Sequence, residues 1–163
     1  MNRPQNAEQS IDHAEKLLQF ADVGASHNFL EVGCGNGSVS KYIAQKYHFT
    51  VTGVDIDPDQ IRRALKNTEA IPNIHFLAAD ATRLPFWDDQ FDLTLSFGVM
   101  HHISNWLDAL REIKRVLKPK GYFIFYDMIF PDWAVKIGKM FKNSYGVTTM
   151  DDVSSFFAKN GKQ

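Results

Sequence analysis

Residues 29–40 read FLEVGCGNGSVS, and this stretch decides the fold. The first four residues form a short run typical of a buried strand, and Gly33, Gly35 and Gly37 follow it in strict alternation. Glycine adopts positive φ without steric penalty and lets backbone amides approach a ligand at the start of the next helix. A tight turn that merely needs glycine is the less favoured alternative, since three alternate glycines follow a strand. The stretch predicts a strand, a ligand-binding turn and a helix.

Two hydrophobic periods alternate along the rest of the chain. Short β-branched or aromatic runs predict strands at 29–32, 49–54, 74–78, 91–97 and 122–126. Helical spacing predicts helices at 11–21 after a capping Ser10, at 39–47, at 58–67 with proline in the first turn, and at 106–117 before a turn at 118–121. The alternation predicts an α/β fold, a doubly wound and mostly parallel sheet covered by helices on both faces.

Length and composition bound the class of protein. The chain has 163 residues, which suits one domain with a hydrophobic core over residues 1–163. Hydrophobic residues make up 44%, charged residues 23%, and the net charge is -1, so disordered and fibrous classes are excluded. This balance gives no sign of a nucleic-acid or membrane partner. With one cysteine, Cys34, and no apolar signal region, a cytoplasmic location is expected.

The residues after the glycine turn narrow the choice of its ligand. Ser38 and Ser40 stand where the dinucleotide pattern Gly-x-Gly-x-x-Gly needs its third glycine, so that pattern fails. The second strand ends in Asp55, about where an acidic side chain meets two ribose hydroxyls, and Ile56 could cover one face of an adenine. An exposed acidic loop residue is the alternative for Asp55. A nucleoside ligand other than a dinucleotide is therefore expected.

Ordered blocks from about Asn6 to Met128 resemble the class I S-adenosylmethionine-dependent methyltransferases, in the small-molecule-type branch. LEVGCGNG at 30–37 is similar to the first motif of the family, and VDID at 54–57 to its acidic block. FLAADATRLPF at 76–86 resembles the adenine-contacting block, FDLTLSF at 91–97 with VMHH at 99–102 the fourth-strand block, and LREIKRVLKPKGY at 110–122 the segment before the fifth strand. The resemblance implies a Rossmann-like methyltransferase fold with S-adenosylmethionine or S-adenosylhomocysteine as cofactor.

The resemblance also implies a set of cofactor contacts. Asp80 would accept a hydrogen bond from the exocyclic amine of the adenine, and the Ala81 amide would meet the ring, although Asp80 could instead cap the following turn. The expected cofactor-binding residues are Glu31, Gly33, Gly35, Asn36, Gly37, Asp55, Ile56, Asp80, Ala81, Ser96 and Phe97. No metal site is expected, because His101 and His102 would point apart in extended backbone. Arg111 and Arg115 are expected to be solvated helix arginines without a chemical role.

Methyl transfer from a sulfonium is an in-line displacement, so the protein mainly aligns the acceptor with the methyl group. His101 is the candidate base for an acceptor that must lose a proton, with a structural or exposed histidine pair as the alternative. Residues 96–99 read SFGV, where methyltransferases of nucleic-acid amines usually carry an Asn/Asp-Pro-Pro-aromatic block. The paired-glutamate signature of arginine methylation is also missing. A small-molecule acceptor is therefore expected.

The C-terminal part departs from the family pattern. The family adds a helix and an antiparallel hairpin after the fifth strand, and we expect this chain to lack the hairpin. Because that region usually builds much of the acceptor pocket, the second hypothesis is a cofactor-binding but inactive or truncated interaction module; a dehydrogenase is less favoured. Without a hairpin, residues 122–129 would form a sheet edge, covered either by residues 133–160 or by a second copy in a homodimer.

Overall fold

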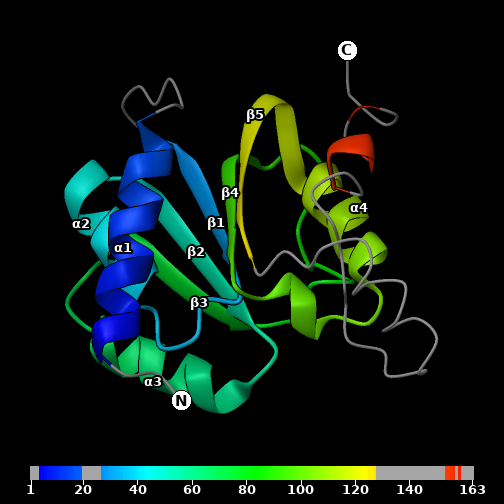
Figure 1. Cartoon of the computed structure of the whole chain (residues 1–163). Coiled ribbons are helices and arrows are strands. Elements are labelled where there is room, and N and C mark those ends of the chain that lie inside the picture. Colours follow the sequence, from blue (N-terminus) through cyan, green and yellow to red (C-terminus); the bar gives the residue numbers. More distant parts are fainter. Residues whose placement is uncertain (1–3, 20–26, 128–152, 157, 159–163) are drawn as a thin grey trace.

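The computed structural model describes residues 4–19, 27–127, 153–156 and 158. Within these residues, five parallel strands form one sheet in the order β3-β2-β1-β4-β5 (Figure 1). The chain builds the sheet outward from β1, first through β2 to β3 and then back past β1 to β4, so the order reverses between β1 and β4. The strands are β1 (Asn28–Val32), β2 (Thr50–Asp55), β3 (Ile74–Ala78), β4 (Phe91–Phe97) and β5 (Leu117–Tyr126). The predicted Rossmann-like fold is confirmed.

Helices cover both faces of this sheet. α1 (Pro4–Leu18), α2 (Ser38–Tyr47) and α3 (Pro58–Asn67) lie on one side, and α4 (Trp106–Val116) lies on the other (Figure 1). Because side chains alternate along a strand, Phe29 of β1 packs into the cluster under α1 and α2, and Leu30 packs into the cluster under α4. None of the helices among the described residues is long and apolar enough to cross a bilayer.

The loop glycines have the predicted backbone geometry. Gly33, Gly35 and Gly37 have φ values of 80°, 51° and 77°, in the left-handed region that glycine tolerates best. Gly37 directly precedes α2, so the turn leads straight into the helix. The start of α3 also agrees with the sequence, with Pro58 in its first turn and the Asp57 carboxylate accepting a hydrogen bond from the Asp59 amide at 2.8 Å.

The predicted start of the first helix is wrong. Ser10 lies inside α1 and does not cap it, because the helix already begins at Pro4. Proline suits the first turn of a helix, where its missing N–H would have no partner in any case. Ala21, the predicted end, lies outside the described residues.

The predicted turn at 118–121 is also wrong. α4 ends at Val116, and Leu117 has extended backbone with φ -81° and ψ 132°, so β5 follows the helix directly. Pro119 favours extended backbone at the preceding residue, which takes the chain out of the helix. The extra residues form an irregularity inside the strand, since Phe91 pairs with Leu117 whereas Leu93 pairs with Tyr122.

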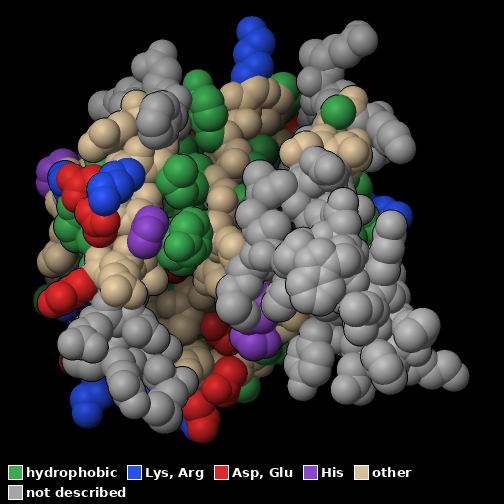
Figure 2. Space-filling model, viewed as in Figure 1, with side chains coloured by type: hydrophobic (Ala, Val, Ile, Leu, Met, Phe, Trp, Pro, Cys, Tyr) green, Lys and Arg blue, Asp and Glu red, His purple; other side chains and the backbone are tan. Residues whose placement is uncertain are grey.

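β5 forms one edge of the sheet within the part of the chain that the structure describes. It exposes Tyr122 and Tyr126, and hydrophobic side chains are visible beside α1 on the face shown in Figure 2. Residues 153–156 are helical, and because Val153 is buried in the cluster under α4 and Phe156 packs against it, these residues lie on the same side of the sheet as α4. The predicted lack of a hairpin and the predicted cover of the β5 edge concern residues outside the described ranges.

Candidate functional site

A cavity of about 520 Å³ lies at the carboxyl ends of the strands, next to the point where the strand order reverses. Parallel α/β sheets bind their ligands at this position, and the volume lies within the usual range for small-molecule pockets. The walls come from the ends of β1 and β2 and from the loops after β3 and β4. The lining residues are Val32, Gly33, Val54, Asp55, Ile56, Ala79, Asp80, Ala81, Thr82, Val99, His102, Ile103, Ser104 and Asn105.

Asp55 joins the glycine turn to the end of β2. Its Oδ2 accepts a hydrogen bond from the Gly35 amide at 2.8 Å, and its Oδ1 accepts one from the Asp57 amide at 2.9 Å. The amides of Gly33 and Cys34 both donate to the Val54 carbonyl, at 2.7 and 2.9 Å. A carboxylate has about four lone-pair sites, so these two backbone contacts leave Asp55 able to accept further hydrogen bonds in the cavity.

Gly33 is the point where the glycine turn meets the loop after β4. A Cβ atom at this position would lie 2.1 Å from Cγ2 of Val99, far inside van der Waals contact. Both residues line the cavity. The absence of a side chain at position 33 therefore lets two cavity walls close together, in addition to allowing the positive φ.

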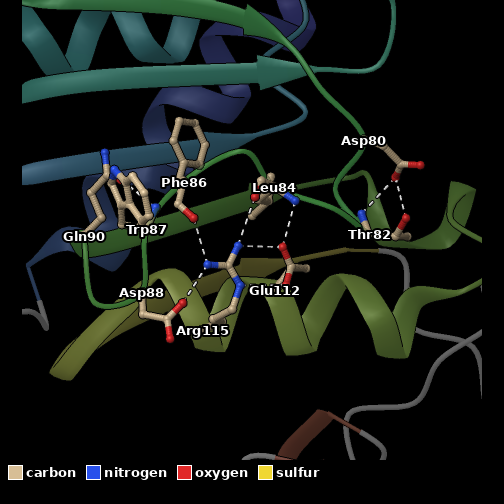
Figure 3. A network of polar contacts seen from close by, with 9 residues as sticks. All are labelled: Asp80, Thr82, Leu84, Phe86, Trp87, Asp88, Gln90, Glu112 and Arg115. Carbon is tan, nitrogen blue, oxygen red and sulfur yellow. Dashed lines mark hydrogen bonds and ion pairs between the residues drawn. The ribbon is translucent and has the colours of Figure 1, made fainter.

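The loop after β3 places Asp80 and Ala81 in the cavity wall. Thr82 donates to Oδ1 of Asp80 from its backbone amide and from its hydroxyl, both at 2.8 Å (Figure 3). The Asp80 side chain is exposed and Ala81 is buried. Because Thr82 occupies Oδ1, Oδ2 is the oxygen with full acceptor capacity.

Glu31 lies beneath the glycine turn and does not line the cavity. Its side chain is buried against α2 and accepts a hydrogen bond from the Ser40 hydroxyl. Burial raises the pKa of this carboxyl to about 8, although the Ser40 hydrogen bond opposes the change. Glu31 is therefore mainly protonated at neutral pH.

The histidine pair after β4 differs from the prediction. His101 and His102 belong to a short 3₁₀ helix, Met100–His102, and their ring centroids lie 3.8 Å apart, so the side chains do not point apart. Nδ1 of His101 lies 2.5 Å from Oδ1 of Asp127, whose side chain is 1% exposed. His102 is exposed and lines the cavity, whereas His101 does not. No cluster of three or more potential metal-ligating side chains occurs among the residues with assigned structure.

Five of the predicted cofactor-binding residues line the cavity, namely Gly33, Asp55, Ile56, Asp80 and Ala81. Gly35 contacts it indirectly, through Asp55. The other predicted residues lie outside the lining, namely Glu31, Asn36, Gly37, Ser96 and Phe97. The Asn36 side chain accepts hydrogen bonds from Ser38, and Phe97 stacks on Tyr126. The Ser96 hydroxyl is buried without a hydrogen-bond partner among the described residues.

Sequence reasoning missed most of the wall formed by the loop after β4. That wall consists of Val99, His102, Ile103, Ser104 and Asn105. The signal that could have found it is general, because the loops at the carboxyl ends of all central parallel strands border the same crevice.

The family description "methyltransferase domain" matches residues 30–125, a range that includes every wall of the cavity. The chain belongs to the class I S-adenosylmethionine-dependent methyltransferase family. S-adenosylmethionine is the cofactor of this family. The match ends at Phe125, so it does not extend into the C-terminal residues that follow β5.

Individual methyltransferases are similar over the same region. A methyltransferase of Streptomyces halstedii is 33% identical over 118 residues, which are 71% of this chain and 42% of that protein. The 2-methyl-6-phytyl-1,4-hydroquinone methyltransferase of a Synechocystis strain is 37% identical over 120 residues, 72% of this chain and 38% of that protein. The crystal structure of the Bacillus subtilis YcgJ protein superposes with a TM-score of 0.79 at 25% identity, covering 91% of this chain and 67% of that one. The chain spans less than half the length of these two curated relatives.

Proposed function

We propose that the cavity binds S-adenosylmethionine and that the chain transfers its methyl group to a small molecule. The observation that carries the proposal is the Asp55 carboxylate, which lies at the carboxyl end of β2, lines the cavity and is hydrogen-bonded to the glycine turn after β1. The names of the relatives support a small-molecule acceptor, since one acts on a hydroquinone. The apolar side chains of Val32, Val54 and Ile103 in the cavity wall favour an acceptor with an apolar body.

The lining residues fit the chemistry of this cofactor. Asp55 retains acceptor capacity for ribose hydroxyls, and Oδ2 of Asp80 is an acceptor for an exocyclic amine. Ile56 is 72% exposed at the cavity edge, so its side chain offers an apolar surface for one face of a purine. Since both carboxylates and this apolar surface border one cavity, the site suits a purine nucleoside.

When bound, S-adenosylmethionine supplies an electrophilic methyl group on a sulfonium. The chain contributes alignment, because the walls around Gly33 and Val99 set where an acceptor lies. We assign the removal of an acceptor proton to His101. The Asp127 carboxylate at its Nδ1 favours the tautomer with the proton on that nitrogen, which leaves the lone pair on Nε2. His102 stacks on this ring and borders the cavity.

Calorimetry with S-adenosylhomocysteine and with a nicotinamide dinucleotide tests cofactor binding. We expect the first to bind and the second not to, and Asp55→Ala to weaken binding of S-adenosylhomocysteine by ~1–3 kcal/mol, because ribose hydroxyls lose a charged acceptor. Asp57→Ala is the matched control, since Asp57 caps α3 outside the cavity. Binding of only the nicotinamide dinucleotide would overturn the cofactor assignment, and unchanged affinity in a folded Asp55→Ala variant would remove Asp55 from the site.

The roles of the two histidines are separated by single substitutions. With a hydroxyl acceptor found by screening, His101→Gln is expected to lower kcat about a hundredfold, the usual contribution of a general base. The affinity for S-adenosylhomocysteine should not change, because His101 does not line the cavity. His102→Gln should mainly raise the KM for the acceptor. A His101→Gln enzyme with normal kcat across the pH range would exclude His101 as the base.

We also propose that residues 1–163 act as one domain and that two copies associate through the edge of β5. Support comes from the exposed Tyr122 and Tyr126 on this strand, which forms an edge of the described sheet. Light scattering over a range of concentrations is expected to show a dimer. The test variant is Tyr122→Lys, and it is compared with Phe123→Lys, which changes the opposite face of β5. A monomer at all concentrations would reject association through this edge.

A further inference from the structure

The segment between β3 and β4, residues 79–90, carries Asp80 and Ala81 into the cavity wall although it contains no helix or strand. Its first residue is fixed by a hydrogen bond from the Ala79 amide to the Asp55 carbonyl at 3.0 Å. A turn comes next, in which the Arg83 amide donates to the Asp80 carbonyl at 3.0 Å. A connection of this length needs further contacts to hold one conformation.

Arg115 of α4 supplies those contacts (Figure 3). Its Nη2 donates to the Leu84 carbonyl at 2.9 Å, and its Nη1 donates to the Phe86 carbonyl and to Oδ1 of Asp88, both at 2.8 Å. Nε and Nη2 also donate to the Glu112 carboxylate, at 2.8 and 2.7 Å. A guanidinium has five N–H donors, so every donor of Arg115 has an acceptor. The expectation of a solvated arginine is wrong, since this side chain is only 30% exposed.

Glu112 completes the contact between α4 and the segment. Its Oε2 accepts a hydrogen bond from the Leu84 amide at 2.8 Å, so the N–H and the C=O of Leu84 are both bound by the Glu112–Arg115 pair. Hydrogen bonds to Arg115 and the Leu84 amide lower the pKa of Glu112, against the effect of burial, and so keep the carboxylate ionised. The end of the segment is tied to the same helix end, because the Asp89 and Gln90 amides donate to the carbonyls of Arg115 and Val116 at 3.0 and 2.8 Å.

The turn that contains Asp80 is therefore fixed by hydrogen bonds before and after it. Ala79 is bonded to β2, and Leu84 is bonded to α4. Leu84 is also buried with Ala81 in the cluster under α4. We propose that Arg115 and Glu112 are positioning residues that place Asp80 and Ala81 against the adenine and thereby set the base specificity of the cofactor site. This inference rests on the proposed function, and neither residue lines the cavity.

Base specificity gives a readout that a purely structural role would not change. The affinities of S-adenosylhomocysteine and S-inosylhomocysteine are measured by calorimetry, since the second ligand lacks the exocyclic amine that Asp80 would bind. In Arg115→Lys, one ammonium group replaces the planar guanidinium group and cannot reach both backbone carbonyls and both carboxylates. We expect its affinity for S-adenosylhomocysteine to fall about tenfold, the size of one lost hydrogen bond to a charged group, and its preference for adenine to fall about threefold or more.

Three further variants make the test specific. Arg111→Lys changes an arginine one turn earlier on α4 that pairs with Asp108, and it should leave the preference unchanged. Asp88→Ala removes an acceptor that is 72% exposed and should have little effect, whereas Glu112→Gln should resemble Arg115→Lys. Hydrogen exchange of the Leu84 amide should accelerate in Glu112→Gln and Arg115→Lys alone. This measurement needs no ligand and identifies a variant that has unfolded.

The outcomes separate the inference from the proposed function. If the unmodified chain binds S-adenosylhomocysteine and folded Arg115→Lys keeps the full preference for adenine, the inference is wrong and the proposed function stands. If the unmodified chain binds S-adenosylhomocysteine and S-inosylhomocysteine equally well, adenine is not recognised through Asp80, and the inference also fails. If the unmodified chain binds neither ligand, the proposed function itself fails.

Discussion

Replacing Gly33 by alanine is expected to destabilise the chain by ~2–5 kcal/mol and to weaken binding of S-adenosylhomocysteine about a hundredfold. Alanine at a φ of 80° costs about 1–2 kcal/mol. The new methyl group would also lie 2.1 Å from Cγ2 of Val99, and overpacking of this kind costs about 1–3 kcal/mol. Since both residues line the cavity, the movement that relieves the clash displaces its wall. Thermal unfolding and calorimetry measure the two effects.

The chain offers a matched control for the backbone contribution. Gly98 has a φ of 64°, and a Cβ atom there would meet nothing within 4 Å, so Gly98→Ala should show only the smaller cost of positive φ. Adding Val99→Ala to Gly33→Ala removes the two methyl groups nearest the clash and should restore part of the stability. If Gly33→Ala and Gly98→Ala lower the free energy of unfolding equally, the close approach of Gly33 to Val99 does not contribute to the destabilisation.

The second large effect is a loss of stability as the pH rises, caused by Glu31. Burial raises the pKa of Glu31 from 4.5 to about 8 in the folded chain. Between these pH values the folded state keeps the proton and the unfolded state releases it, so the free energy of unfolding falls as the pH increases. Above pH 8 the folded carboxyl also ionises and the decrease ends. At 1.36 kcal/mol for each tenfold difference in proton affinity, the decrease approaches ~5 kcal/mol.

Glu31→Gln isolates this contribution, because glutamine stays neutral at every pH. We expect the variant to match the unmodified chain near pH 5 and to be more stable by several kcal/mol at pH 9, as measured by urea unfolding. The difference between the two proteins is the relevant quantity, since every other ionisable side chain is common to both. Ser40→Ala removes the hydrogen bond that favours the ionised carboxylate, so it should raise the pKa of Glu31 further and extend the decrease to higher pH. Parallel curves for Glu31→Gln and the unmodified chain would show that Glu31 is ionised in the folded state.

Local pattern was sufficient for the framework of the molecule. The alternation of strand and helix periods and the glycines after β1 depend on neighbours a few residues apart, so they predicted the parallel sheet and the positive φ values. Asp55 could be placed in the same way, because it ends the strand next to the glycine turn. The predicted element boundaries were wrong where a local signal was interpreted as the end of a helix followed by a turn, as at residues 118–121.

The sequence by itself determined the order of the elements, the glycine turn and the acidic end of β2, since these depend on backbone preference and hydrophobic period. Only the tertiary structure decided which side chains meet. Arg115 binds Leu84 from 31 positions away, and His101 contacts Asp127 from 26 positions away, so no local pattern contains either pair. The physical reason is that ionic and hydrogen-bonding partners are selected by distance in the folded chain, which sequence spacing does not encode.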